Sequence, residues 1–112
     1  MNTKSKLSQK VLKNKYKPLF QYFINGLKDL YWAEKAVEAL LKKNKSLAYT
    51  EELSDALEDH EKQTQKHIRR LEKIFDSLKE KAEAKKCEAM AGLVKEAEET
   101  VKETPKNSMT RD

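Results

Sequence analysis

Two long stretches of the chain repeat apolar residues at helical spacing, and a short polar break separates them. In the first, from Pro18 to about Lys45, one face carries Phe20, Phe23, Ile24, Leu27, Tyr31, Val37 and Leu41. In the second, from Thr50 to Leu78, one face carries Leu53, Ala56, Leu57, His60, Thr64, His67, Ile68, Leu71, Ile74, Phe75 and Leu78. Two helices of similar length with a short connection predict an antiparallel hairpin.

The limits of these helices follow from local signals. Pro18 is acceptable in a first helical turn, so the first helix is expected to begin there. Thr50 predicts the start of the second helix, because threonine is a good N-cap and the acids that follow it, Glu51 and Glu52, favour the first turn.

A third and shorter helix is predicted near the end of the chain. It follows a charged stretch from Lys79 to Lys86, and its apolar side holds Cys87, Met90, Ala91, Val94, Ala97 and Val101. Pro105 and Asn107 predict a loop beyond it. The expected organisation is an all-α fold with a basic, flexible arm over 1–17, a helical domain over 18–102 and a tail over 103–112.

The composition is typical of a small helical protein. Of the 112 residues, 38% are charged, and only 2 glycines and 2 prolines are available to interrupt helices. The core of such a short chain is modest, so oligomerisation would help to stabilise it. No apolar run approaches the roughly 20 residues of a membrane span, and no signal-peptide pattern follows the start. We therefore expect a cytoplasmic protein without membrane contact. The single cysteine, Cys87, is expected to be a small buried hydrophobic residue.

The net charge of +5 comes from the start of the chain. Six lysines precede Pro18 with no acid among them, which leaves 18 basic and 19 acidic residues, a net charge of about −1, for the rest. The arm holds no arginine and a single aromatic residue, Tyr16. A solvated terminus is the expected role, and nucleic-acid binding is not expected.

A carboxylate, Glu34, lies near the middle of the apolar stripe of the first helix. A charge at such a position needs a partner, because a buried carboxylate without one costs several kcal/mol. His60 and His67 lie on the stripe of the second helix, so the hairpin would bring them toward Glu34. Carboxylates and imidazoles inside a helical bundle are suitable ligands for iron, manganese or zinc. Glu34, His60 and His67 are thus candidate metal ligands, and an ion pair between Glu34 and a histidine is an equally weighted alternative. The spacing also allows a hydrogen bond from Thr64 to the carbonyl group of His60.

Three strings in the chain resemble the bacterial YciE/YciF-type ferritin-like stress proteins. They are FINGLKDLYWAEK at 23–35, HEKQT at 60–64 and KCEAMAGLVKEA at 86–97. The resemblance implies a ferritin-like four-helix bundle, an association with stress responses and a di-metal centre of iron or manganese. It carries Glu34 over as a ligand, His67 as a plausible second ligand and His60 as a weaker one.

Two departures from the family pattern affect this expectation. The family acid expected in the second helix is replaced by Gln63 on the inner face and Lys62 on the outer face, and this chain stops before two further helices of the family. The expected structure is therefore half of a four-helix bundle that forms a homodimer or binds a helical partner. We expect weak metal binding in a self-associated bundle, and the sequence assigns no reaction to it. The alternatives are a non-metal helical interaction module and a truncated coding product without activity of its own.

Overall fold

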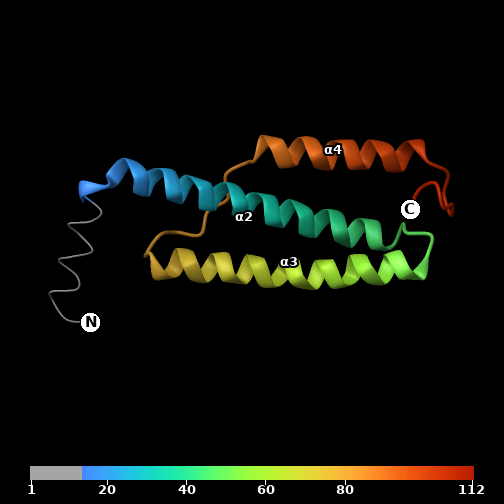
Figure 1. The fold of residues 1–112 in the computed structure, drawn as a ribbon, viewed down its shortest axis with the longest axis horizontal. Coiled ribbons are helices and arrows are strands. Elements are labelled where there is room, and N and C mark those ends of the chain that lie inside the picture. Colours follow the sequence, from blue (N-terminus) through green and yellow to red (C-terminus); the bar gives the residue numbers. More distant parts are fainter. Residues whose placement is uncertain (1–13) are drawn as a thin grey trace.

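The computed structural model describes residues 14–112, and three helices form the fold of this part of the chain. Helix α2 comprises Lys17–Lys45, α3 comprises Glu51–Ser77 and α4 comprises Glu88–Glu103. α2 and α3 run antiparallel across a short turn, and α4 runs parallel to α2 on the opposite side from α3 (Figure 1). The predicted all-α fold, with a long antiparallel hairpin and a shorter third helix, is confirmed.

The helix limits lie within two residues of the predicted ones. Pro18 occupies the first turn of α2, and the hydroxyl group of Thr50 accepts a hydrogen bond of 3.3 Å from the backbone N–H of Leu53 at the start of α3. α4 runs one residue past the expected boundary at 102. Of the predicted basic arm, residues 1–13 lie outside the described residues, and Lys17 already belongs to α2.

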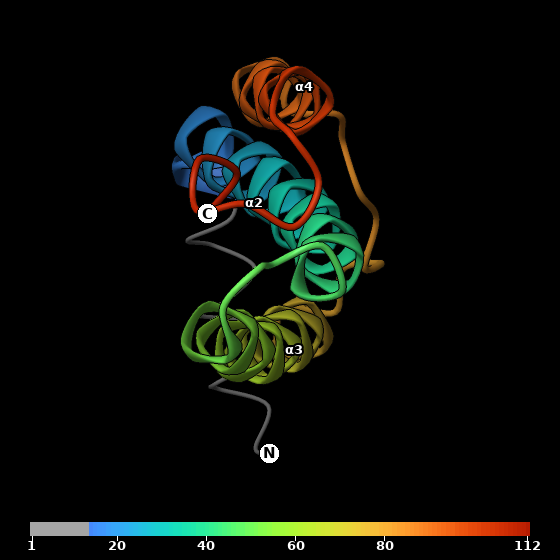
Figure 2. The ribbon, with the colours of Figure 1, turned by 90° about the vertical axis from the view of Figure 1, so that its right-hand side faces the viewer.

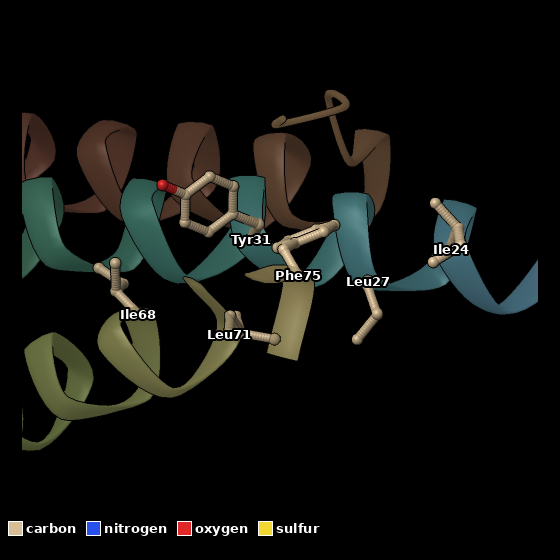
Figure 3. Packing of buried hydrophobic residues seen from close by; sticks show 6 residues of the cluster. All are labelled: Ile24, Leu27, Tyr31, Ile68, Leu71 and Phe75. Carbon is tan, nitrogen blue, oxygen red and sulfur yellow. The ribbon is translucent and has the colours of Figure 1, made fainter. Parts of the chain in front are cut away.

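A small apolar core holds the hairpin together. Ile24, Leu27 and Tyr31 of α2 pack against the buried residues of α3 shown beside them in Figure 3, which are Ile68, Leu71 and Phe75. The Phe75 side chain is completely buried, and its ring meets the Tyr31 ring edge to face with 5.7 Å between centroids. The Tyr31 hydroxyl group donates a hydrogen bond of 2.8 Å to Glu72 at the rim of this core.

Several residues of the predicted stripes lie outside the core. Phe23 and Ile74 are exposed to 49% and 39%, and His60 is exposed as well. The prediction for these residues was wrong because a stripe read at 100° per residue is wider than the line along which two helices touch. Cys87 is half-buried at the N-cap of α4 and is not the buried hydrophobe that we expected.

The three helices lie side by side in a single layer. The end view in Figure 2 shows α3, α2 and α4 in one row, and the molecule measures 62 × 25 × 15 Å along its principal axes. The shortest dimension is close to the thickness of one helix, about 10–12 Å with side chains. No residue of α4 is buried. One layer of helices cannot enclose a core on both sides, so α2 has sides that no other described helix covers.

No helix in the described part of the chain combines the length and the apolar character that a membrane crossing requires.

Candidate functional site

The structure brings two of the three predicted ligands together. The Nδ1 atom of His67 lies 3.5 Å from the Oε2 atom of Glu34, and the two side chains are 47% and 29% exposed. This contact is an ion pair when His67 is protonated. The Glu34 carboxylate is therefore half-buried beside an imidazole group. This arrangement agrees with the ion-pair alternative, and it also provides two of the donors that a metal site would need.

The third predicted ligand lies apart from this pair. His60 precedes His67 by seven residues, which is about 10 Å along α3, and its side chain is exposed. Within residues 14–112, no group of three or more His, Cys, Asp or Glu side chains is arranged to hold a metal ion. A structural zinc site uses four protein ligands, and a catalytic one usually keeps three. The described part of one chain thus supplies two donors of a metal site and does not complete it.

The buried carboxylate of the hairpin is Glu61, which the sequence interpretation missed. Glu61 is 6% exposed, and its Oε1 atom accepts a hydrogen bond of 2.7 Å from the Lys45 ammonium group at the end of α2. This bond is the largest of the effects that raise the pKa of Lys45 above its ordinary value of 10.5. Gln63 and Lys62, which we expected at the family's acidic position, are both exposed on α3. The sequence did contain a signal for the burial of Glu61. This residue precedes Thr64, a member of the predicted stripe, by three residues and so lies on nearly the same face of the helix.

The predicted hydrogen bond of Thr64 is absent. The Thr64 side chain is 1% exposed, and its hydroxyl group has no hydrogen-bond partner among the described residues. The expectation that it bonds to the carbonyl group of His60 was wrong. A buried hydroxyl group without a partner is therefore part of the α2–α3 interface, one turn from both Glu61 and His67.

The Glu34–His67 pair lies on an uncovered apolar side of the layer. At 100° per residue, Leu19, Phe23 and Leu30 lie within about 60° of Glu34 around α2, and Ile74 lies about 20° from His67 around α3. These four side chains are 64%, 49%, 54% and 39% exposed. We call this side the open face, and its residues are Leu19, Phe23, Leu30, Glu34, His67 and Ile74. The opposite side of α2 carries the polar residues Gln21, Asn25 and Lys35 together with Trp32.

The C-terminal segment binds the ends of two helices. The Asp112 carboxylate accepts hydrogen bonds from the backbone N–H groups of Tyr49 and Thr50 at 2.7 and 2.9 Å and from the Thr50 hydroxyl group at 2.8 Å. These hydrogen bonds hold the pKa of Asp112 below its ordinary value of 3.8, and the bond from the Tyr49 backbone has the largest effect. The Arg111 guanidinium group donates to the carbonyl groups of Val101 and Thr104 at 2.8 and 2.7 Å, at the end of α4. The segment predicted as a loop is thus a clasp between α4 and the start of α3.

Comparison with known proteins identifies the family of this hairpin. The family model described as "Domain of unknown function (DUF892)" matches residues 18–112, which is most of the chain. The chain belongs to the DUF892 family. This YciF-type chain is 35% identical over 94 residues to Protein YciF of Escherichia coli (strain K12), a match that covers 83% of the chain and 57% of YciF. The predicted YciE/YciF-type relationship is confirmed.

A solved structure shares the arrangement of the helices. YcfI from Rhodopseudomonas palustris superimposes with a TM-score of 0.73 at 36% sequence identity, over 79% of this chain and 56% of YcfI. The chain therefore spans little more than half the length of the relatives that it matches.

Proposed function

We propose that this YciF-type chain is a helical assembly module whose open face is covered by a second copy of the chain. The observation that carries the proposal is the single layer of helices with exposed leucine, phenylalanine and isoleucine side chains on one face. Contiguous exposed apolar surface of this kind is typical of interaction sites. A two-layer stack would also give the molecule the two-sided core that helical domains normally have.

A second copy is the occupant that requires no further component. Twofold dimers are the commonest oligomers, and their interface uses the same surface patch on both chains. The apolar side chains of the open face suit such self-pairing, because those of one chain can pack on those of the other. The stress-associated role that the family resemblance implies is part of this proposal and would be a role of the assembled form.

Substitution of Leu30 by Asp tests the proposal. The wild-type protein is expected to have twice the mass of one 13.1 kDa chain in light scattering at tens of micromolar, and Leu30→Asp is expected to have the mass of a single chain. Gln21→Asp is the matched control, since Gln21 is an exposed polar residue on the opposite side of the same helix and the same acid there should leave the mass doubled. A wild-type protein with the mass of one chain would overturn the proposal.

Metal binding between chains is the second candidate function, and the contact of Glu34 with His67 favours it. Two donors do not fit a metal ion in one chain, but two chains that meet at this pair would supply four. Calorimetric titration with Fe²⁺, Mn²⁺ or Zn²⁺ tests the idea. Uptake at one metal ion per two chains, lost in Glu34→Gln, would support it. The absence of uptake by both proteins would rule it out.

A further inference from the structure

Helix α2 carries two parallel stripes whose members are spaced alternately by four and three residues, the spacing of coiled-coil seams. The first stripe faces α3 and comprises Phe20, Ile24, Leu27, Tyr31, Glu34, Glu38, Leu41 and Lys45. The second stripe precedes it by one residue throughout and comprises Leu19, Phe23, Gly26, Leu30, Ala33, Val37, Leu40 and Asn44. One residue corresponds to 100° of rotation about the helix axis, so the second stripe lies to one side of the contact between α2 and α3.

Only half of the second stripe is covered. Its last four residues are half-buried, and α4 lies alongside the C-terminal half of α2 (Figure 1). Its first four residues are all exposed, with Leu19 at 64%, Phe23 at 49% and Leu30 at 54%. We call these four residues, Leu19, Phe23, Gly26 and Leu30, the free seam.

The centre of the free seam is a glycine that nothing in the described part of the chain requires. Gly26 lies in the interior of a helix, where glycine is less favourable than alanine. Its φ angle is not positive, and a Cβ atom placed on it would meet nothing within 4 Å. Neither backbone conformation nor packing among residues 14–112 explains the glycine at this position. Because glycine has no side chain, the backbone of another helix can approach closely at this position, as it does at helix crossings with small residues.

A second glycine shows what is special about this position. Gly92 of α4 is also helical and exposed, and a Cβ atom there would likewise meet nothing within 4 Å. Its neighbours one turn away are Glu88 and Glu96, whereas those of Gly26 are Tyr22 and Leu30. Tyr22 and Leu30 are 78% and 54% exposed, so Gly26 lies between large uncovered apolar side chains.

We propose that the free seam packs against the same seam of a second copy, with the two α2 helices antiparallel and crossing at Gly26. This inference rests on the proposed self-association and names its contact. In this register Phe23 of one chain lies against Leu30 of the other, twice over, and the two glycines meet at the twofold axis.

The charges along α2 favour the antiparallel direction. The start of the helix has Lys17, with Lys15 just before it, and no acid in its first turn, whereas the stretch from Glu34 to Glu38 holds two acids and one base, Lys35. An antiparallel crossing at Gly26 brings the lysines of one chain near this stretch of the other, where acids outnumber bases by one, and it also opposes the two helix dipoles.

The same register separates the two Glu34–His67 pairs. Glu34 lies eight residues from Gly26, which is about 12 Å along the helix, so the pairs of the two chains would be about 24 Å apart. One metal ion cannot reach donors at both. A dimer that crosses at Gly26 and a metal centre shared between two Glu34 residues are therefore alternative arrangements.

Substitution of each glycine by leucine tests the register in the full chain. Sedimentation equilibrium should show that Gly26→Leu weakens the dimer at least about tenfold, because the larger side chain keeps the helices apart. Gly92→Leu should leave the dimer Kd unchanged. Circular dichroism should show undiminished helix content in both variants, since a Cβ atom meets nothing within 4 Å at either position and leucine favours a helix more than glycine does.

A disulfide provides the direct measurement of the crossing. In a Cys87→Ser background, Gly26→Cys is expected to oxidise to a species of doubled mass on a non-reducing gel, because a residue on a twofold axis meets its own copy. Gly92→Cys should remain single. A wild-type monomer would overturn the proposed self-association itself. A dimer unaffected by Gly26→Leu and without the Gly26→Cys disulfide would overturn only this register.

Discussion

At the scale of single residues, the interface between α2 and α3 holds an unusual hydroxyl group. Thr64 is almost fully buried, and its oxygen has no partner among the described residues. Leaving a buried polar group unpaired costs about 1–3 kcal/mol, whereas replacing it by an apolar group of the same shape removes that cost. The position thus weakens a hairpin whose core is already small.

The substitution Thr64→Val keeps the shape and removes the hydroxyl group. We expect it to raise the free energy of unfolding by about 1–3 kcal/mol in urea denaturation, because the unpaired oxygen is gone. Thr100→Val on the exposed side of α4 is the control and should change stability by less than about 0.5 kcal/mol. A loss of stability in Thr64→Val would mean that the hydroxyl group is hydrogen-bonded in solution.

At the scale of elements, the start of α3 depends on a residue far away in sequence. Thr50 caps the helix locally, and Asp112 binds Tyr49 and Thr50 from a position 62 residues after Thr50. The carboxylate also suits the positive end of the helix dipole. The clasp therefore joins the α2–α3 turn to α4, which has no buried residue of its own.

Removal of this carboxylate should loosen the first turn of α3. In Asp112→Ala, hydrogen exchange at the amides of Tyr49 and Thr50 should become faster, while Asp59→Ala on the exposed side of α3 should leave it unchanged. Because folding lowers the pKa of Asp112, its protection of these amides should be complete above about pH 4 and be lost as the pH falls through the lowered value. Exchange rates that are identical in Asp112→Ala and wild type would contradict the clasp.

The same scale shows what sequence patterns could and could not predict. The helix limits followed from Pro18, Thr50 and the apolar spacing, and the meeting of Glu34 with His67 followed from the antiparallel hairpin. The rotation of α3 about its own axis was harder to predict. His60 and Glu61 are 100° apart around the helix, and the line of contact with α2 decides which of the two is buried. The Asp112 clasp had no local signal, since only the folded chain brings its partners together.

At the scale of the whole molecule, the chain is long and thin. Its radius of gyration is 19.1 Å, against about 13 Å for a compact domain of this length. The all-α class was predictable from composition and periodicity, but the single layer was not, because the sequence patterns do not reveal which side of α2 the third helix takes. A stack of two such layers would double the thickness and convert the open face into an interior.

The ion pair between Lys45 and the buried Glu61 carboxylate, near the end of the hairpin, has a consequence for alignment. Apolar stripes that repeat every three or four residues fit nearly as well after a slide of one turn, so they specify the relative position of two helices only weakly. Glu61 removes this freedom, since any slide would take its buried carboxylate away from Lys45 and leave a charge without its counterion. The pair therefore favours a single alignment of α2 and α3. The turn between α2 and α3 could therefore vary in length while the two helices keep the same neighbours.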